Sequence, residues 1–148
     1  MRFLIVGACL LWIAAATPAV SRSGGVAGCR GEQLRLSVQS QGENTTAWIG
    51  VSIRNRGRSC RLDGVMTFKL LGAGRLLRIT GNPLRVRTSG LLGADGTRLV
   101  RADWSNWCGN RSGLTLRVQY AARTVTFAFT YSPVCLNAVQ PSRLVAIG

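Results

Sequence analysis

The stretch LTLRVQYAARTVTFAFTY, residues 114–131, decides the fold. Apolar and polar residues alternate on both sides of Ala121-Ala122-Arg123, which is the period of a half-buried β-strand. Two such segments joined by a short link are typical of a β-hairpin with one apolar face. The apolar positions are Leu114, Leu116, Val118 and Tyr120 before the link, and Val125, Phe127, Phe129 and Tyr131 after it.

The same alternation continues through most of the chain, and helical periodicity is nearly absent beyond the apolar N-terminal segment. A second hairpin is predicted over residues 34–53, with its turn at Gln41-Gly42-Glu43-Asn44. Further strands are predicted over residues 66–70, 77–79, 84–88, 100–104 and 143–147. Short strands at regular spacing, separated by Gly-rich turns, predict an all-β, antiparallel β-sandwich of about seven to nine strands.

The N-terminal segment, residues 1–19, has the pattern of a signal peptide. Arg2 precedes an apolar segment, residues 3–16, and the small residues around Ala19 suit cleavage, with Ser21 as a second choice. The alternative is an uncleaved anchor, but the apolar segment is shorter than the ~20 residues of a membrane span. We therefore predict a signal peptide over residues 1–19 and a single domain over residues 29–148. No later segment is apolar enough to cross a membrane, so we expect a secreted, periplasmic or cell-envelope protein.

Four cysteines follow the predicted signal peptide. They are Cys29, Cys60, Cys108 and Cys135. An even number of cysteines after an export signal predicts disulfide bonds. The alternative is a redox or metal site, but the chain has no histidine and no Cys-x-x-Cys, and we expect no metal and no cofactor.

The turn positions favour one disulfide pairing. A turn near Glu43 lies 14 residues after Cys29 and 17 before Cys60, and a turn near Ala122 lies 14 residues after Cys108 and 13 before Cys135. Residues equidistant from a hairpin turn lie opposite each other. Of the three possible connectivities, this predicts Cys29–Cys60 with Cys108–Cys135.

A lipobox-like run, Val26-Ala27-Gly28-Cys29, raises the alternative of a lipoprotein. A lipobox should adjoin the apolar part of the signal, but residues 21–25 lie between the two. Lipidation of Cys29 would also leave three cysteines in an oxidising compartment. We therefore do not expect lipidation at Cys29.

Arginine dominates the charge of the chain. Nineteen basic and five acidic residues give a net charge of +14, and removal of Arg2 with the signal peptide leaves +13. Such a field attracts polyanions. The alternative is that the arginines reflect a G+C-rich genome and that the charge serves solubility.

Four arginines within eight residues form a possible anion-binding patch. They are Arg54, Arg56, Arg58 and Arg61. Guanidinium groups bind phosphate and carboxylate bidentately, which suits recognition, whereas a solvated loop is the alternative. A basic wet face would be extended by Arg85, Arg87, Arg101 and Arg117.

Three of the tryptophans have predictable surroundings. Trp104 shares its face with apolar neighbours and is expected in the core, and Trp107 is expected beside Cys108 or at one end of the sandwich. Trp48 falls on the polar face of its strand, where it either makes contacts with a partner or packs beneath a loop. No set of exposed aromatic residues suits base stacking, so we expect no sequence-specific binding of nucleic acid.

The residues around the cysteines resemble a bacterial family. Asn55-x-Gly57-x-x-Cys60-x-Leu62-x-Gly64 is followed by Trp104-x-x-x-Cys108 and by Cys135. This pattern resembles family 4232 of the domains of unknown function, a secreted four-cysteine family abundant in actinobacteria, and it extends from Cys29 to about Pro141. Met66 stands where members often have proline. The resemblance implies an immunoglobulin-like sandwich of the cell envelope, with no catalytic residue and no known ligand.

The sequence does not favour catalysis. Without histidine the usual triads are impossible, a Ser–Lys dyad would need Lys69, and Asp95 with Asp103 lacks a substrate groove as a glycosidase pair. We therefore predict a non-catalytic domain with a binding or structural role, whose partner is an envelope protein or an anionic polymer. The alternative is a generic polyanion-binding protein with an Arg-rich surface.

Overall fold

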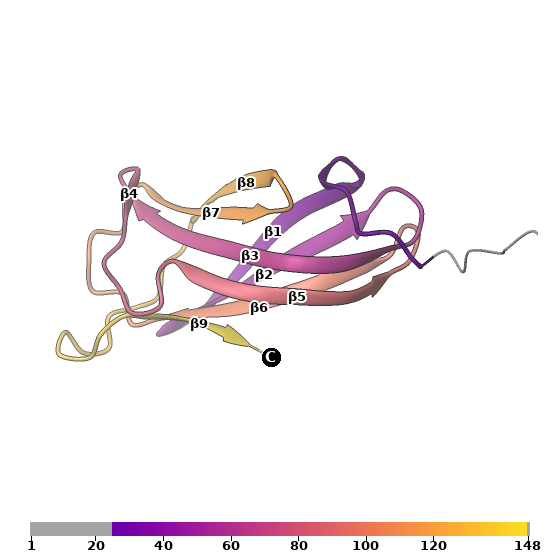
Figure 1. Cartoon of the computed structure of the whole chain (residues 1–148). Coiled ribbons are helices and arrows are strands. Elements are labelled where there is room, and N and C mark those ends of the chain that lie inside the picture. The colour runs from indigo at the N-terminus through magenta and orange to yellow at the C-terminus, as the bar shows by residue number, and fades with distance from the viewer. Residues whose placement is uncertain (1–24, 148) are drawn as a thin grey trace, which may run out of the picture.

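The computed structural model describes residues 25–147, and within this range two β-sheets pack face to face (Figure 1). The elements are η1 (Gly31–Gln33), β1 (Leu34–Glu43), β2 (Thr46–Asn55), β3 (Cys60–Gly72), β4 (Arg75–Leu76), β5 (Leu84–Leu92), β6 (Thr97–Ser105), β7 (Leu114–Tyr120), β8 (Arg123–Ala128) and β9 (Arg143–Ile147). All paired strands are antiparallel, which confirms the predicted antiparallel β-sandwich with nine strands and two disulfides.

The two sheets have different strand orders. One sheet, which we call the β2 sheet, has the order β1-β2-β6-β9. The other, the β3 sheet, has the order β4-β3-β7-β8, with β5 also paired to β3. Residues 60–68 of β3 pair with β5 and residues 67–72 pair with β7, so β3 lies at the centre of its sheet. Gly28 continues this sheet by pairing in parallel with Arg61.

Both predicted hairpins are present, with tighter turns than expected. The first turn is Asn44-Thr45, because β1 extends to Glu43 and pairs there with Thr46. The second turn is Ala121-Ala122, and Arg123 already belongs to β8. Positive φ angles of 45° and 62° at these two alanines fit the twist of a two-residue hairpin turn.

The short fourth strand is shifted from its predicted place at 77–79. It covers Arg75–Leu76 and pairs with the end of β3. Leu77 and Ile79 instead pack partly buried against the core, and the amide of Leu77 still donates to the carbonyl of Leu70 at 3.0 Å. The two side chains are apolar and inward-facing, as the sequence predicts, but the backbone leaves the sheet before them.

The core consists of the inward-facing residues of both sheets. Trp104 is fully buried, as predicted, and its indole Nε1 donates to the Ser142 hydroxyl at 3.1 Å. Its ring lies 5.8 Å from that of Trp107 and 5.3 Å from that of Phe129. These aromatic rings fill one end of the sandwich, which agrees with the expected position of Trp107.

The two disulfides lie at opposite ends of the sandwich, and both predicted pairs are confirmed. Cys29–Cys60 joins the segment before η1 to the start of β3. Cys108–Cys135 joins the β6–β7 loop to the loop that follows β8. In Figure 1 the segment before η1, which contains Cys29, is drawn in indigo at one end of the sandwich, and the loop that follows β8 lies at the other end, near the yellow loop. The disulfides therefore fasten the loops at both ends and leave the outer faces of the sheets free.

Candidate functional site

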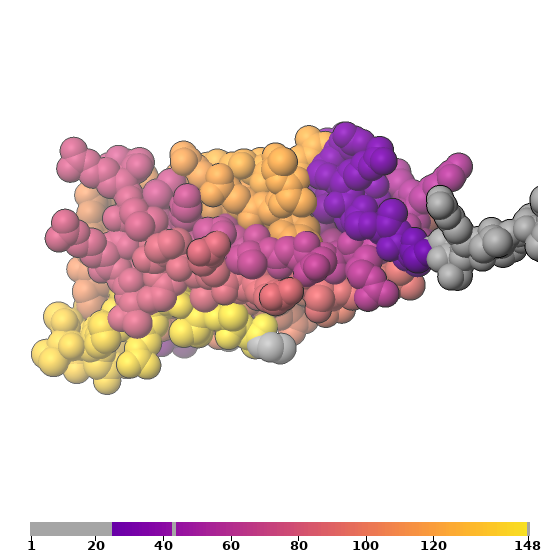
Figure 2. Space-filling model, viewed as in Figure 1, coloured from indigo at the N-terminus to yellow at the C-terminus, as the bar shows by residue number. Residues whose placement is uncertain are grey.

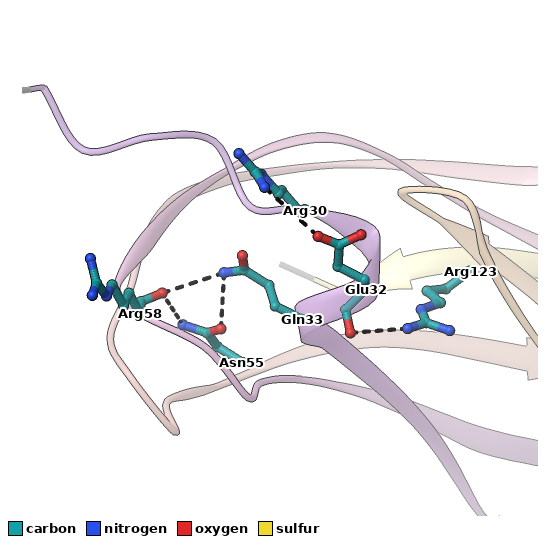
Figure 3. Close-up of polar contacts among 6 residues, drawn as sticks. All are labelled: Arg30, Glu32, Gln33, Asn55, Arg58 and Arg123. Atoms are coloured by element: carbon teal, nitrogen blue, oxygen red, sulfur yellow. Dashed lines mark hydrogen bonds and ion pairs between the residues drawn. The ribbon is translucent and has the colours of Figure 1, made fainter.

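The end of the sandwich near Cys60 is held by the buried amide of Asn55 (Figure 3). Its Nδ2 donates to the carbonyls of Arg58 and Gly93, both at 2.9 Å. Its Oδ1 accepts from Nε2 of Gln33 at 3.1 Å and from the amide of Gly57 at 2.9 Å. One side chain thus joins three segments, and the amides of Asn55 and Gln33 serve the fold.

The opposite end has a matching arrangement around Asn106, which is also buried. Its Nδ2 donates to the carbonyls of Asn137 and Gln140 at 2.9 and 2.7 Å, and its Oδ1 accepts from the amide of Leu136 at 2.8 Å. Asn106 has a φ of 53°, which asparagine tolerates better than most residues. The loop after β8 is therefore held by this amide as well as by Cys135.

The structure distributes the four clustered arginines over different surfaces. Arg54 projects from the outer face of the β2 sheet, where it forms an ion pair with Asp95 at 3.7 Å. Arg56 and Arg58 are exposed in the β2–β3 loop, and Arg61 lies on β3 in the other sheet. Closeness in sequence does not bring these side chains onto one face, and anion binding by them stays a prediction.

Arg123 shows that some arginines hold the fold together. Its Nε donates to the carbonyl of Gly31 at 2.7 Å, and its Nη2 donates to the carbonyl of Glu32 at 3.0 Å. Figure 3 shows the guanidinium beside the backbone of η1, next to the exposed ion pair of Arg30 and Glu32. Arg123 therefore attaches η1 to the β7–β8 hairpin.

The outer face of the β3 sheet is strongly basic. Strand register places Arg87 beside Val65, Arg85 beside Thr67 and Arg117 beside Lys69, all on the same face. Figure 2 shows β3 and β5 forming a continuous strip along the molecule. We call the following residues the basic face: Arg61, Lys69, Arg85, Arg87 and Arg117.

Only one carboxylate among the described residues stands on the basic face. Asp63 lies 3.4 Å from Nη2 of Arg87, and both side chains are mostly exposed. Arg85, Arg87 and Arg117 share one face, as the sequence predicts, and Lys69 joins them there without having been predicted. Arg101 belongs to the other face of the sandwich.

The outer face of the β2 sheet carries a depression of about 450 Å³ around Trp48. Its lining residues come from β1, β2 and β6, and we call the site the Trp48 depression: Gln41, Thr46, Trp48, Arg101 and Asp103. Register places Gln41, Trp48 and Asp103 in one row across the three strands. This partly exposed tryptophan lies among strand residues, and the expectation that it packs beneath a loop is not met within the described range.

Gly50 allows the Trp48 ring to lie along the sheet. It follows Trp48 on the same face, and a Cβ at this position would stand 2.5 Å from Cη2 of the indole. The guanidinium carbon of Arg101 lies 5.9 Å from the centre of the ring, within the range of a cation–π contact. The ring is thus positioned by Gly50 of its own strand and by Arg101 of β6.

The hydrogen-bonding capacity of the polar groups around Trp48 is not used within the described part of the protein, where Arg101 contacts the ring only through its cation–π interaction. Within residues 25–147, the side chains of Gln41, Arg101 and Asp103 take part in no hydrogen bond or ion pair. An amide, a guanidinium and a carboxylate therefore face one ring with their bonding capacity free. The sequence indicated Trp48 but not its neighbours, because the pairing of β2 with β6 joins segments about 50 residues apart.

The structure separates the two carboxylates considered as a glycosidase pair. Asp95 lies in the β5–β6 loop and Asp103 lies near the far end of β6. Eight residues of largely extended chain span roughly 25 Å, whereas catalytic carboxylates lie within about 10 Å of each other. Between Gly25 and Ile147, no three side chains of Cys, Asp or Glu gather in a way that would suit a metal ion.

No helix in the described part of the chain is long and apolar enough to cross a membrane. Comparison of the chain with protein-family models, with curated proteins and with solved structures found no match.

Proposed function

We propose that the chain is an exported, non-catalytic β-sandwich of the bacterial cell envelope, where it acts as a binding domain. The observation that carries the proposal is the pair of disulfides at opposite ends of the sandwich. Disulfides persist in oxidising compartments outside the cytoplasm. The buried amides of Asn55 and Asn106 are engaged in the fold at the two ends, and the outer faces of the sheets are broad surfaces available to a partner.

The state of Cys29 bears on how the domain is held in the envelope. Lipidation of a bacterial lipoprotein uses the thiol sulfur of its first cysteine, and here that sulfur is bonded to Cys60. The same atom cannot serve both bonds. This supports a domain released by cleavage after Ala19 over one anchored at Cys29.

The family resemblance supports the proposed location and an immunoglobulin-like fold. Its motif residues have structural duties: Asn55 holds three segments, and Leu62 is buried in the core. Gly64 lies against the ring of Tyr120, where a Cβ would come within 3.0 Å of the ring carbon Cε2. A motif of this kind preserves a scaffold, which fits a family defined by its fold rather than by a catalytic site.

Two measurements test the proposal. The full chain, expressed with its own leader in a bacterial host, should leave the cytoplasm and yield a mature protein that begins at Val20 with both disulfides formed. The purified mature domain should bind isolated bacterial envelopes along a saturable isotherm. Cytoplasmic accumulation as a reduced protein would overturn the proposed location, and binding that never saturates would overturn the binding role.

The basic face supports polyanion binding as a second candidate function. Five cations and one carboxylate occupy one side of the β3 sheet, in a chain with a net charge of +14. A concentrated field of one sign raises the local concentration of anionic polymers. This candidate differs from the first in its strong dependence on salt.

A further inference from the structure

The Trp48 depression combines an aromatic ring with hydrogen-bonding groups of opposite charge. The row Gln41, Trp48 and Asp103 crosses three neighbouring strands and is about 10 Å wide at the usual strand spacing. Arg101 stands in the next row on β6, beside Gly50. All these side chains project from regular strands, so their relative positions are fixed by the sheet rather than by a loop.

The partly exposed indole suits a partner with an apolar surface. A partly exposed tryptophan on the wet face of a sheet keeps some of its apolar area in contact with water, and binding would remove that contact. Val145 and Ile147 on β9 are 47% and 37% exposed and extend the apolar surface of the same face. A ligand that lies flat along the sheet would therefore meet apolar groups in more than one row.

The charges around the ring indicate a neutral and hydroxyl-rich ligand. Arg101 and Asp103 cancel in net charge, and neither is engaged by another described side chain in a hydrogen bond or ion pair. Hydroxyl groups donate to a carboxylate and accept from a guanidinium, and an amide such as that of Gln41 does both. A polyanion would meet Asp103 unfavourably here, while the basic face on the opposite sheet would suit it better.

A peptide partner fits the depression less well than a sugar chain. Protein hot spots bury anchoring side chains in desolvated pockets, whereas this site is an open depression on the outer face of a sheet, lined mostly by polar side chains. A pyranose ring has a C–H face that stacks on an indole and an equatorial rim of hydroxyls. The Trp48 depression offers an indole for the C–H face and hydrogen-bonding side chains for the hydroxyls.

We propose that the Trp48 depression binds a neutral polysaccharide, with one pyranose ring stacked on Trp48 and its hydroxyls bonded to Gln41, Arg101 and Asp103. This inference rests on the proposed function and names the class of ligand. It predicts contact through uncharged groups, so the affinity should change little with salt. That behaviour separates it from binding at the basic face.

Isothermal titration of the mature domain tests the proposal. The probes are neutral hexasaccharides of glucose, mannose, galactose, xylose and N-acetylglucosamine, each at millimolar concentration and in both about 0.1 M and about 1 M salt. At least one should bind, with an affinity that salt changes by less than about threefold. Failure of the whole panel, or an affinity that collapses in high salt, would overturn the proposal.

Variants show whether the binding lies in the Trp48 depression. Trp48→Ala should weaken binding about tenfold or more, and Asp103→Asn should weaken it less because the amide still accepts a hydrogen bond. Gly50→Ala keeps the indole but pushes it from the sheet, so it should also weaken binding. Arg117→Gln, on the opposite face, is the matched control and should bind as the unaltered domain does.

Folding is checked by the thermal midpoint of each variant. If Trp48→Ala does not fold, Gln41→Ala serves as the second test, because Gln41 is exposed and its replacement should not disturb the fold. Folded variants that bind the sugar at full strength would refute the site. Saturable binding to envelopes without sugar binding would refute this inference alone, whereas the absence of both would refute the proposed function as well.

Discussion

Cys29 and Cys60 stand at equal distances along the chain from the first hairpin turn, the former counted back from Asn44 and the latter counted forward from Thr45. Cys108 and Cys135 have the same relation to the second turn, at Ala121-Ala122. Both pairs lie beyond the strands of their own hairpins, and Cys60 stands at the start of β3. Each disulfide therefore closes the open mouth of a hairpin.

Removing one disulfide should destabilise the domain strongly. The bonds close loops with sequence separations of 31 and 27 residues, and on the chain-entropy estimate each contributes about 3.5 kcal/mol. The double variants Cys29→Ala/Cys60→Ala and Cys108→Ala/Cys135→Ala avoid unpaired thiols. Denaturant unfolding should show similar losses in the two, and a loss below about 1 kcal/mol in either would contradict the entropic account.

Asn55→Ala should lower the free energy of unfolding by about 2–4 kcal/mol, because the substitution removes the hydrogen bonds of a buried amide and leaves the amide of Gly57 without its partner. The carbonyls of Arg58 and Gly93 keep the bonds that they accept from Gln33 and Gly96. Asn110→Ala is the matched control, because the exposed Asn110 side chain bonds only within its own turn, to Ser112. Urea denaturation of both variants measures the difference in their free energies of unfolding. Equal losses would show that the hydrogen bonds of Asn55 contribute no more than those of an exposed turn.

Ala122→Gly should stabilise the domain by about 1 kcal/mol. Ala122 has a φ of 62°, a left-handed conformation that is unfavourable for residues with a Cβ and open to glycine. Ala128→Gly, in the extended chain of β8, removes the same methyl group where no such relief exists and should destabilise slightly. Thermal unfolding distinguishes the two, and a destabilised Ala122→Gly would mean that the turn is not strained.

Ser40→Ala should leave stability unchanged or raise it by up to about 1 kcal/mol. Ser40 points into the core opposite Ile49, and its buried Oγ has no hydrogen-bond partner among the described residues. Ser37→Ala on the exposed face of the same strand is the control and should be neutral. A marked loss of stability in Ser40→Ala alone would indicate that the hydroxyl is satisfied in solution.

Binding to duplex DNA, used as a generic polyanion, should depend on where the cations lie. Replacing Arg85, Arg87 and Arg117 by glutamine should lower the dependence of log K on log salt by about 0.9 for each phosphate that the domain no longer neutralises. The control variant replaces Arg54, Arg56 and Arg58 by glutamine. It removes the same total charge, but from the outer face of the β2 sheet and from the β2–β3 loop. Equal effects of the two triple variants would show that net charge, not the basic face, controls binding.

Much of the fold was predictable because its determinants are local. Period-2 alternation and turn residues located both hairpins, and the turn positions then identified the disulfide pairs. The exact turns depend on backbone detail: two alanines with positive φ are not a recognisable turn signal, so the sequence predicts a link after Tyr120 that is one residue too long. Leu77 and Ile79 likewise have strand-like spacing but only fill the core.

The candidate sites were less accessible to sequence reasoning. The side chains around Trp48 come from strands distant in the chain, and only the β2–β6 register brings Asp103 and Arg101 beside it. The clustered arginines show the opposite effect. They are close in sequence, but the chain passes from one sheet to the other between Arg54 and Arg61, so their side chains lie on different faces of the sandwich. Local patterns therefore predict which residues are exposed to solvent, but strand pairing decides which of these exposed residues lie next to each other.

The buried asparagines and the disulfides place the strongest constraints at the two ends of the molecule. In most sandwiches the loops tolerate insertion and substitution while the sheets are held constant. Here the loops around Asn55 and Asn106 should be the intolerant regions, and the exteriors of both sheets should accept change. Libraries for a new binding specificity would accordingly be built on strand residues of a flat face, and not on the loops that are diversified in antibodies.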